Sequence, residues 1–231
     1  MTGAVALTLV AAGCSNDGTG DDGSDAGPST STTKPREAQP SDTTGPIKDA
    51  ALAAGSVIVS RTTRSGGAEG GITQEEIEVE LTEPMSGRVL HVGEEIWTLD
   101  IVAGVGYLKD QTEKKSTNRW TRLSGAETTK RLEDVTLDGL LGVLDDASAI
   151  TKTEPATVGG VAATCHSLTL RPDPDVDEGP VPQSARVCVD GDRRPVELLV
   201  IADADVTTSV FTQWGVAVEA MAPPPNLVDA D

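Results

Sequence analysis

The sequence contains few aromatic residues and few positive charges. Phe, Trp and Tyr together make up 2% of its 231 residues, so a core must be built from Val, Leu, Ile and Ala. Asp and Glu outnumber Lys and Arg by 37 to 18, which gives a formal net charge of −19 and a pI near 4.3. Nucleic-acid phosphates and anionic lipid headgroups repel such a chain. We therefore expect no nucleic-acid partner, and any attachment to a membrane must be apolar or covalent.

The chain also offers little material for catalysis or metal binding, since it holds two histidines and three cysteines. His91 and His166 both fall in strand-like patterns, and neither has a nearby Ser or Cys in the context of a nucleophile elbow; no HExxH motif exists. Trp97, Trp120 and Trp214 are most simply packing residues. No catalytic constellation is found, so we predict a protein that is not an enzyme and that needs neither a metal nor a cofactor.

Two motifs that suggest ligand binding lack necessary residues. The acidic stretch 173–179, DPDVDEG, superficially resembles a calcium loop, but its glycine falls one place late and Ser184 stands where a bidentate Glu is needed. The pair Gly104 and Gly106 lacks the third glycine and the helix of a dinucleotide site. We interpret the first as a solvated acidic hairpin tip and the second as a strand bend.

The start of the chain predicts export. Residues 4–13, AVALTLVAAG, are too short to span a bilayer but suit the hydrophobic region of a signal peptide. The stretch 11–14, AAGC, resembles the bacterial lipobox, which implies a signal peptide over 1–13 and acylation of Cys14, with palmitate or a similar chain. No Lys or Arg precedes the apolar run, so we infer that part of the basic segment is missing and that translation starts upstream. The alternative is a buried N-terminal strand or helix with an ordinary cysteine.

Residues 14–45 are predicted to form a lipidated, disordered tether. From Ser15 to about Gly45 the chain is Gly, Ser, Thr, Asp and Pro with almost nothing apolar. Too little surface can be buried there to offset the entropy of ordering. A coil of roughly 30 residues reaches about 30 Å, enough to hold a domain clear of the headgroups. We expect a protein anchored in the plasma membrane and displayed on its extracytoplasmic face.

A single folded domain is expected over 46–231, beginning with a short helix over 46–52 whose proline lies in the first turn. Strand-like runs follow, and in the run 75–83 Ile77, Val79 and Leu81 alternate with glutamates, as in an antiparallel strand with one wet face. Many strands and few parallel crossovers favour an α+β fold with a strongly bent antiparallel sheet and helices on one side. The expected strands are 57–63, 75–83, 87–92, 95–102, 104–110, 119–123, 150–158, 161–171, 185–190, 195–201, 207–215 and 216–221.

One helical segment is predicted between the strands, over 125–149. Ser124 and Glu127 have the spacing of a capping box. Four leucines then recur at i, i+3, i+4 and i+7, which gives an apolar stripe that packs on the sheet. Two glycines within the segment weaken the helix, which suits either a mobile flap or close packing of small residues. The leucines are Leu137, Leu140, Leu141 and Leu144, and the glycines are Gly139 and Gly142.

Cys165 and Cys188 lie on successive expected strands, so a hairpin would place them opposite each other. A compartment outside the membrane permits disulfides, and we predict a structural bridge, with free buried thiols as the alternative. Cys14 is then the unpaired cysteine, which agrees with its acylation.

Three stretches resemble a known family when taken with the lipobox and the tether. They are GVGYLKD…NRWTRL (104–123), VCVDGDRRPVELLVI (187–201) and SVFTQWGVAVEAMAPP (209–224). Together they are similar to the LppX/LprG-type lipoproteins of high-GC Gram-positive bacteria, from Pro46 to the C-terminus in order of elements. The resemblance implies a LolA-like half-barrel with helices on its concave side and an apolar cavity that carries lipids or lipoglycans. This chain is more acidic than the familiar carriers, and the pair of Cys165 and Cys188 is not assigned to the family at large.

The leading functional prediction is a lipoprotein that binds an acylated lipid or glycolipid in an apolar cavity, without catalysis. A filled core would instead favour a non-enzymatic interaction or sensor module that acts through the acidic surface or the loop 172–184. The sequence identifies neither the ligand nor the oligomeric state. The residues expected to line the cavity, which are equally the expected core, are Leu137, Leu140, Leu141 and Leu144 on the helix and Ile77, Val79, Leu81, Leu99 and Ile101 on the sheet.

Overall fold

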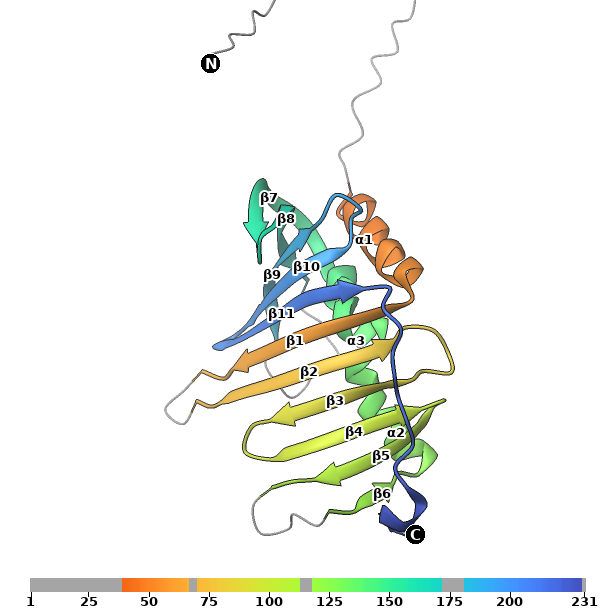
Figure 1. Cartoon of the computed structure of the whole chain (residues 1–231). Coiled ribbons are helices and arrows are strands. Elements are labelled where there is room, and N and C mark those ends of the chain that lie inside the picture. Colours follow the sequence, from red (N-terminus) through yellow and green to blue (C-terminus); the bar gives the residue numbers. More distant parts are fainter. Residues whose placement is uncertain (1–38, 67–69, 113–117, 172–180, 230–231) are drawn as a thin grey trace, which may run out of the picture. The chain divides into compact units, whose positions relative to one another are not determined.

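A computed structural model describes residues 39–66, 70–112, 118–171 and 181–229 (Figure 1). The signal peptide, Cys14, the tether up to residue 38 and the acidic stretch 173–179 lie outside these residues and stay predictions. Within the described part, the strands form one twelve-stranded sheet in the order β12-β6-β5-β4-β3-β2-β1-β11-β10-β9-β8-β7. Their bounds are β1 Ser56–Arg64, β2 Ile72–Glu80, β3 Gly87–Val92, β4 Ile96–Val102, β5 Val105–Asp110, β6 Trp120–Arg122, β7 Ala147–Val158, β8 Val161–Leu170, β9 Pro182–Val189, β10 Pro195–Ala202, β11 Asp205–Trp214 and β12 Val228–Asp229.

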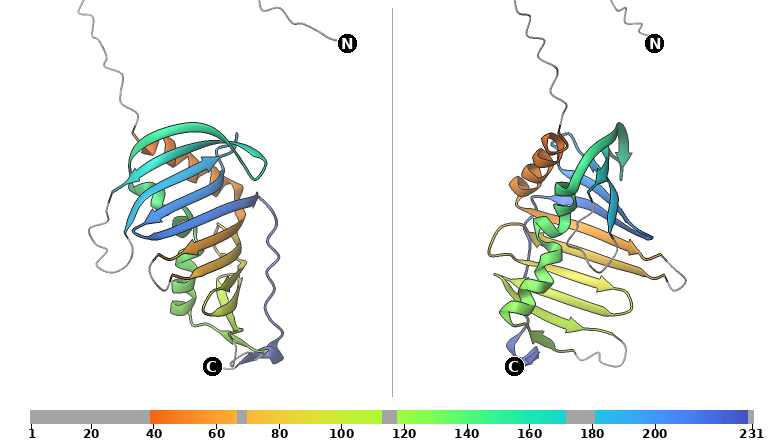
Figure 2. Two further views of the ribbon diagram at one scale, coloured as in Figure 1. Left: turned by 90° about the vertical axis from the view of Figure 1, so that its left-hand side faces the viewer. Right: turned by 180° about the vertical axis from the view of Figure 1, so that it is seen from behind.

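The sheet is bent and open, and the helices lie on its concave face (Figure 2). Neighbouring strands are antiparallel except β12, which pairs parallel with β6 at one edge. The helical elements are α1 Ser41–Ala54, α2 Gly125–Leu132, η1 Glu133–Val135, α3 Leu137–Leu141, η2 Gly142–Asp146 and η3 Pro225–Leu227. The α+β half-barrel with helices on the concave side is therefore confirmed.

Helix α1 begins five residues earlier than the sequence pattern suggested. It runs from Ser41 to Ala54, so the ordered chain begins before 46 and Pro46 lies inside the helix. A proline at this sixth position removes one backbone hydrogen bond but leaves the first turn intact. Ile47 and Ala51, one turn apart, are buried against the sheet and hold the helix in place. The helix ends at Gly55, whose φ of 79° suits a glycine.

Lys48 joins α1 to α3 and η2 by ion pairs to Asp138 and Asp145 at 2.9 and 2.6 Å. Burial acts to lower the pKa of Lys48, but its hydrogen bonds to the two carboxylates outweigh burial and raise that pKa.

The segment expected as helical over 125–149 is divided into four short pieces, and β7 already begins at Ala147. The predicted capping box is present, because the Ser124 side chain accepts from the Glu127 backbone and the Glu127 carboxylate accepts from the Ser124 backbone. The Ser124 hydroxyl and the Ser124 backbone N–H both donate to the Glu127 carboxylate, and these two hydrogen bonds lower the pKa of Glu127. The helix breaks after Leu132, and Thr136 caps a second start by accepting from the Gly139 backbone N–H.

The C-terminal residues do not form the expected strand over 216–221. Both sides of β11 are already paired, with β1 and β10, so no free edge remains for another strand there. The chain turns at Gly215 and crosses the sheet on the face away from the helices until β12 reaches β6 (Figure 1). We call residues 215–229 the C-terminal strap. Arg119 fastens its end by an ion pair with Asp229 and a hydrogen bond to the Val228 carbonyl.

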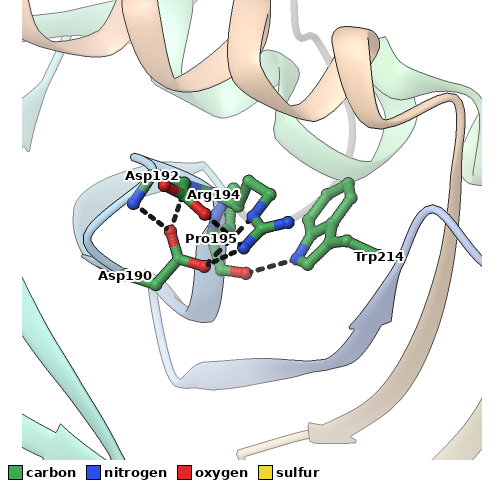
Figure 3. A network of polar contacts seen from close by, with 5 residues as sticks. All are labelled: Asp190, Asp192, Arg194, Pro195 and Trp214. Carbon is green, nitrogen blue, oxygen red and sulfur yellow. Dashed lines mark hydrogen bonds and ion pairs between the residues drawn. The ribbon is translucent and has the colours of Figure 1, made fainter.

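The turn between β9 and β10 is held by a polar network (Figure 3). One Asp190 carboxylate oxygen accepts from the backbone N–H groups of Asp192 and Arg194, and the other accepts from the Arg194 guanidinium. The same guanidinium pairs with Asp192 at 2.7 Å. Beside this turn, the Trp214 indole N–H donates to the Pro195 carbonyl at 2.8 Å, which links β11 to the start of β10.

Candidate functional site

The concave face of the sheet changes from apolar to polar along the strands. Because side chains alternate between faces, every second residue of each strand lies on the concave face. Strand pairing brings these residues into rows that cross the sheet. Two rows are mostly apolar and largely buried, one of Val57, Val79, Gly87 and Ile101 and one of Phe211, Val59, Ile77, Val89, Leu99 and Leu108.

The next row toward the strand ends is polar and spans five adjacent strands, from β11 to β4. We call it the polar row, and it consists of Ser209, Arg61, Glu75, His91 and Trp97. Arg61 Nη1 lies 3.3 Å from one Glu75 oxygen, and His91 Nδ1 lies 3.1 Å from the other. The His91 ring stacks on Trp97 with centroids 4.6 Å apart. An ion pair between Arg61 and Glu75 therefore lies on the concave face beside the core.

A fourth row, at the strand ends, carries hydroxyl groups. Thr63 and Thr207 lie opposite each other, and their hydroxyl oxygens are 3.1 Å apart. Thr73 continues the row on β2, where it is paired with Thr63.

The helical segment covers the apolar rows and stops beside the polar row. Arg61 Nη2 donates to the Asp134 carbonyl at 2.9 Å, and the Arg131 guanidinium lies 4.9 Å from the centre of the Trp97 ring. Both arginine contacts join the helical segment to the polar row. Beyond them the concave face is uncovered, as the view from the helix side shows (Figure 2).

An open groove of about 460 Å³ lies between the uncovered strand ends and the helical segment. Its size is in the range of roughly 300–1,000 Å³ that small-molecule sites occupy. The polar lining comes from the polar row, the threonines and Asp134, whereas the apolar lining comes from both the helical segment and β10. The apolar residues are Leu140, Val143, Leu198 and Val200, and the polar ones are Arg61, Glu75, Ser209, Thr63, Thr73, Thr207 and Asp134.

Gly139 and Pro182 complete the wall of the groove. A Cβ added at Gly139 would lie 2.0 Å from the Glu133 carbonyl oxygen and 2.5 Å from the Asp134 carbonyl carbon. The glycine is therefore required for the tight fold of α3 against η1. Of the two interpretations of these glycines, close packing explains Gly139.

The nine residues expected to line an apolar cavity lie mainly in the core. Eight are buried and pack in one cluster, whereas Leu137 is partly buried against it. Only Leu140 among the nine borders the groove. The groove itself is open and has both polar and apolar lining residues, whereas the sequence suggested an apolar cavity.

The residues that form the polar floor were missed by sequence reasoning, although a signal was present. The alternation that places Val57 and Val59 on the inner face continues to Arg61 and Thr63 on the same strand. A run that changes from aliphatic to polar on one face predicts that the face leaves the core. The expected strand included these residues, but they were not assigned to a site.

A second hollow of about 430 Å³ is bordered by α2. Leu108 and Leu123 form its apolar part, and Glu127, Lys130 and Arg131 form its charged part. Asp134 borders both hollows, so they adjoin at η1.

The two histidines are strand-face residues, as expected, but in different surroundings. His91 belongs to the polar row at the open end. His166 lies on β8 beside α1, in a small hollow that Thr43 and Pro46 also border, and its Nδ1 is 3.1 Å from the Thr153 hydroxyl. Burial lowers the pKa of His166.

Cys165 and Cys188 are direct partners on β8 and β9 and are joined by a disulfide. Both are buried in a small apolar cluster with Ala163 and Val196. Arg186, which is paired with Glu197, donates to the Cys165 sulfur at 3.2 Å. The bridge lies away from the groove, which agrees with a structural role.

Among the described residues, no His, Cys, Asp or Glu cluster of three or more is arranged to hold a metal ion. A search of the same residues finds no helix long and apolar enough to cross a membrane.

The fold is shared with two solved structures. The lipoprotein LppX of Mycobacterium tuberculosis is 14% identical, with a TM-score of 0.53, over 78% of this chain and 98% of LppX. LprF from Mycobacterium bovis is 12% identical, with a TM-score of 0.51, over 79% of this chain and 97% of LprF. No protein-family model and no curated protein matches the sequence. At these identities the likeness concerns the fold, and it confirms the fold that the sequence resemblance implied.

Proposed function

We propose that this protein is a lipid-anchored lipoprotein of the extracytoplasmic face of the plasma membrane that binds an acylated lipid or glycolipid, without catalysis. The observation that carries the proposal is the groove, whose aliphatic wall and polar floor face the same space. Acyl chains suit the wall formed by Leu140, Val143, Leu198 and Val200. Burial of apolar area there would contribute about 25 cal/mol per Å².

The polar floor suits the other end of such a ligand. The threonine hydroxyls both donate and accept hydrogen bonds, and the paired Arg61 and Glu75 offer a donor and an acceptor side by side. An amphiphile lying across the groove would meet apolar atoms on one side and hydrogen-bonding groups on the other.

The lipid anchor at Cys14 supports the same function. Two acyl chains, at about 0.8 kcal/mol per buried CH₂, would hold the protein stably at the membrane. The net charge of −19 removes any electrostatic attraction to anionic lipids, so the covalent anchor would supply the membrane attachment. Labelling with radioactive palmitate tests this part, since a Cys14→Ala variant should lose the label; equal label in both chains would refute acylation.

Ligand binding is tested by a substitution that places a large side chain in the groove. Thr63→Trp would place an indole in the groove, whereas Thr62→Trp, on the opposite face of the same strand, would leave the groove open. With the full chain and a fluorescent diacylglycerol as probe, we expect Thr63→Trp to weaken binding at least tenfold and Thr62→Trp to leave it unchanged. Native mass spectrometry of the protein purified from its host should show a bound mass of a lipid.

Equal binding by both tryptophan variants would place the ligand elsewhere. A ligand-free mass spectrum together with no uptake of the probe would reject the carrier function. It would favour a second candidate, a non-enzymatic interaction or sensor module of the cell envelope. One observation favours that candidate, namely that eight of the nine residues expected to line a cavity are packed into the core.

A further inference from the structure

The outer rim of the strand ends carries an apolar patch. It consists of Ile72, Leu90, Val92 and Ile96, and we call it the rim patch. Ile72 and Val92 are 59% and 39% exposed, two of the five large hydrophobic side chains that are exposed in the described part of the chain. Exposed aliphatic side chains that cluster indicate a surface that contacts another apolar phase.

Strand register places these four side chains together on the convex face. Val92 lies directly opposite Ile96, and Gln74, two residues from Ile72, lies opposite Val92. Ile72 is therefore a diagonal neighbour of Val92. Their chain neighbours Thr73, His91 and Trp97 belong to the concave rows, so period two turns the patch to the other face.

The rim patch lies behind the floor of the groove. Thr73 and Glu75 line the groove from β2. Ile72 lies at the same end of β2, on the opposite, convex face of the sheet. The turn that joins β3 to β4 lies at the same strand ends (Figure 1). A flat apolar phase that met the patch would therefore also lie close to the open end of the groove.

We propose that the rim patch docks on the surface of a lipid bilayer, next to the open end of the groove. This inference rests on the proposed lipid anchor at Cys14, which would be the first residue of the processed chain. Gln39 lies 25 residues after Cys14. A coil of that length reaches about 25–30 Å, so the domain stays close to the bilayer throughout. Because the anchor already confines the domain near the bilayer, a weak apolar contact forms there with little further loss of translational entropy.

The charge of the protein determines which bilayer the patch prefers. Glu94 and Glu95 are exposed in the turn beside the patch, and the net charge is −19. Anionic headgroups would repel this surface, and salt would screen the repulsion. Docking is therefore apolar insertion, stronger on zwitterionic than on anionic vesicles and strengthened by salt on the anionic ones.

The test uses the full chain with Cys14→Ala, so that no acyl anchor contributes. Co-sedimentation with phosphatidylcholine vesicles is compared with an Ile72→Ser/Val92→Ser variant. We expect the partition coefficient of the variant to fall about tenfold, since two aliphatic side chains no longer insert. The matched control is Val161→Ser, which removes a side chain of similar exposure, 44%, from the turn between β7 and β8.

The inference is overturned if the double variant partitions as its parent does, or if Val161→Ser lowers partition equally. Stronger binding to vesicles containing phosphatidylglycerol at low salt would also overturn it. So would a dimer of the parent, seen by analytical ultracentrifugation, that the double variant loses, because a second copy would then cover the patch.

Failure of the docking and failure of the proposed function are distinguishable. The double variant leaves the groove lining intact and should still bind the fluorescent diacylglycerol delivered from detergent. Probe binding without patch-dependent partition would refute only the docking. Patch-dependent partition without probe binding would refute only the ligand-binding function.

Discussion

The two halves of the concave face differ in what fills them. In the covered half, helices α1 and α3 meet rows of Val, Ile and Leu, and side chains such as Leu99 and Leu141 are completely buried. In the open half, the same strands carry Arg61, Glu75 and threonines, and the helical segment reaches only the Arg61 end of this region. The strand geometry is continuous across both halves, so side-chain chemistry decides where the core ends. The covered half contains the buried core, and the open half borders the groove that we propose as the binding site.

The position of the boundary between the halves depends on how tightly the helical segment folds. Gly139→Ala tests this tight folding, and it is the variant with the largest expected effect. The added Cβ would overlap backbone atoms of Glu133 and Asp134, which cannot move without shifting the segment. We expect a loss of about 3 kcal/mol in the free energy of unfolding, measured by urea denaturation.

Gly142→Ala is the matched control. The nearest atom to its added Cβ is 3.9 Å away, and its φ of −59° suits alanine. This variant should gain about 0.5–1 kcal/mol. Equal loss in both variants would mean that helical flexibility, and not close packing, explains these glycines.

A reciprocal exchange along β1 tests whether chemistry alone separates the halves. Val59→Thr places a hydroxyl in the core, where Val59 is fully buried, and should cost about 2 kcal/mol. Thr63→Val in the open half removes only a hydroxyl paired with Thr207 at a partly exposed site, so we expect a change within about 1 kcal/mol. Urea denaturation of both variants measures the difference, and similar losses would contradict the division.

The smallest expected effect concerns acid stability of the covered half. Burial beside α1 lowers the pKa of His166 in the folded state, so the unfolded chain binds its proton more readily. Stability is thus unaffected well above the unfolded pKa of about 6.5 and is lost as the pH falls through that value toward the folded pKa. Between pH 7.5 and 5, the parent should lose more of its free energy of unfolding than His166→Gln does, as measured by urea denaturation at each pH. A larger loss in the variant would reverse the assigned sign.

Most strands could be predicted from alternation, since residues such as Ile77 and Val79 are separated by charged residues that face water. The capping box at Ser124 and the hairpin that pairs the two cysteines are also local signals, and both are present in the structure. The start of α1 was misplaced because Pro46 normally marks a first turn, whereas here it lies within the helix.

The groove could not be derived from the sequence in the same way. Leucines such as Leu141 and Leu144 are typical of a packed core and equally of a lipid cavity. Only the three-dimensional packing shows which of the two they form. The polar row requires Arg61 of β1 and Ser209 of β11 to be neighbours, and no local pattern predicts a pairing across so much of the chain. Residues 216–221 alternate like a strand, but they find no free edge to pair with.

The pairing of β1 with β11 also constrains when the domain can form. These two strands join the two parts of the sheet, and the bond between Thr63 and Thr207 spans 144 residues. A chain leaving the ribosome or passing through a translocation channel cannot complete the sheet until β11 has emerged. Such distant contacts make folding slow. If the protein is exported as proposed, it would gain from this delay, because the contact between β1 and β11 would remain unformed until the crossing is nearly finished.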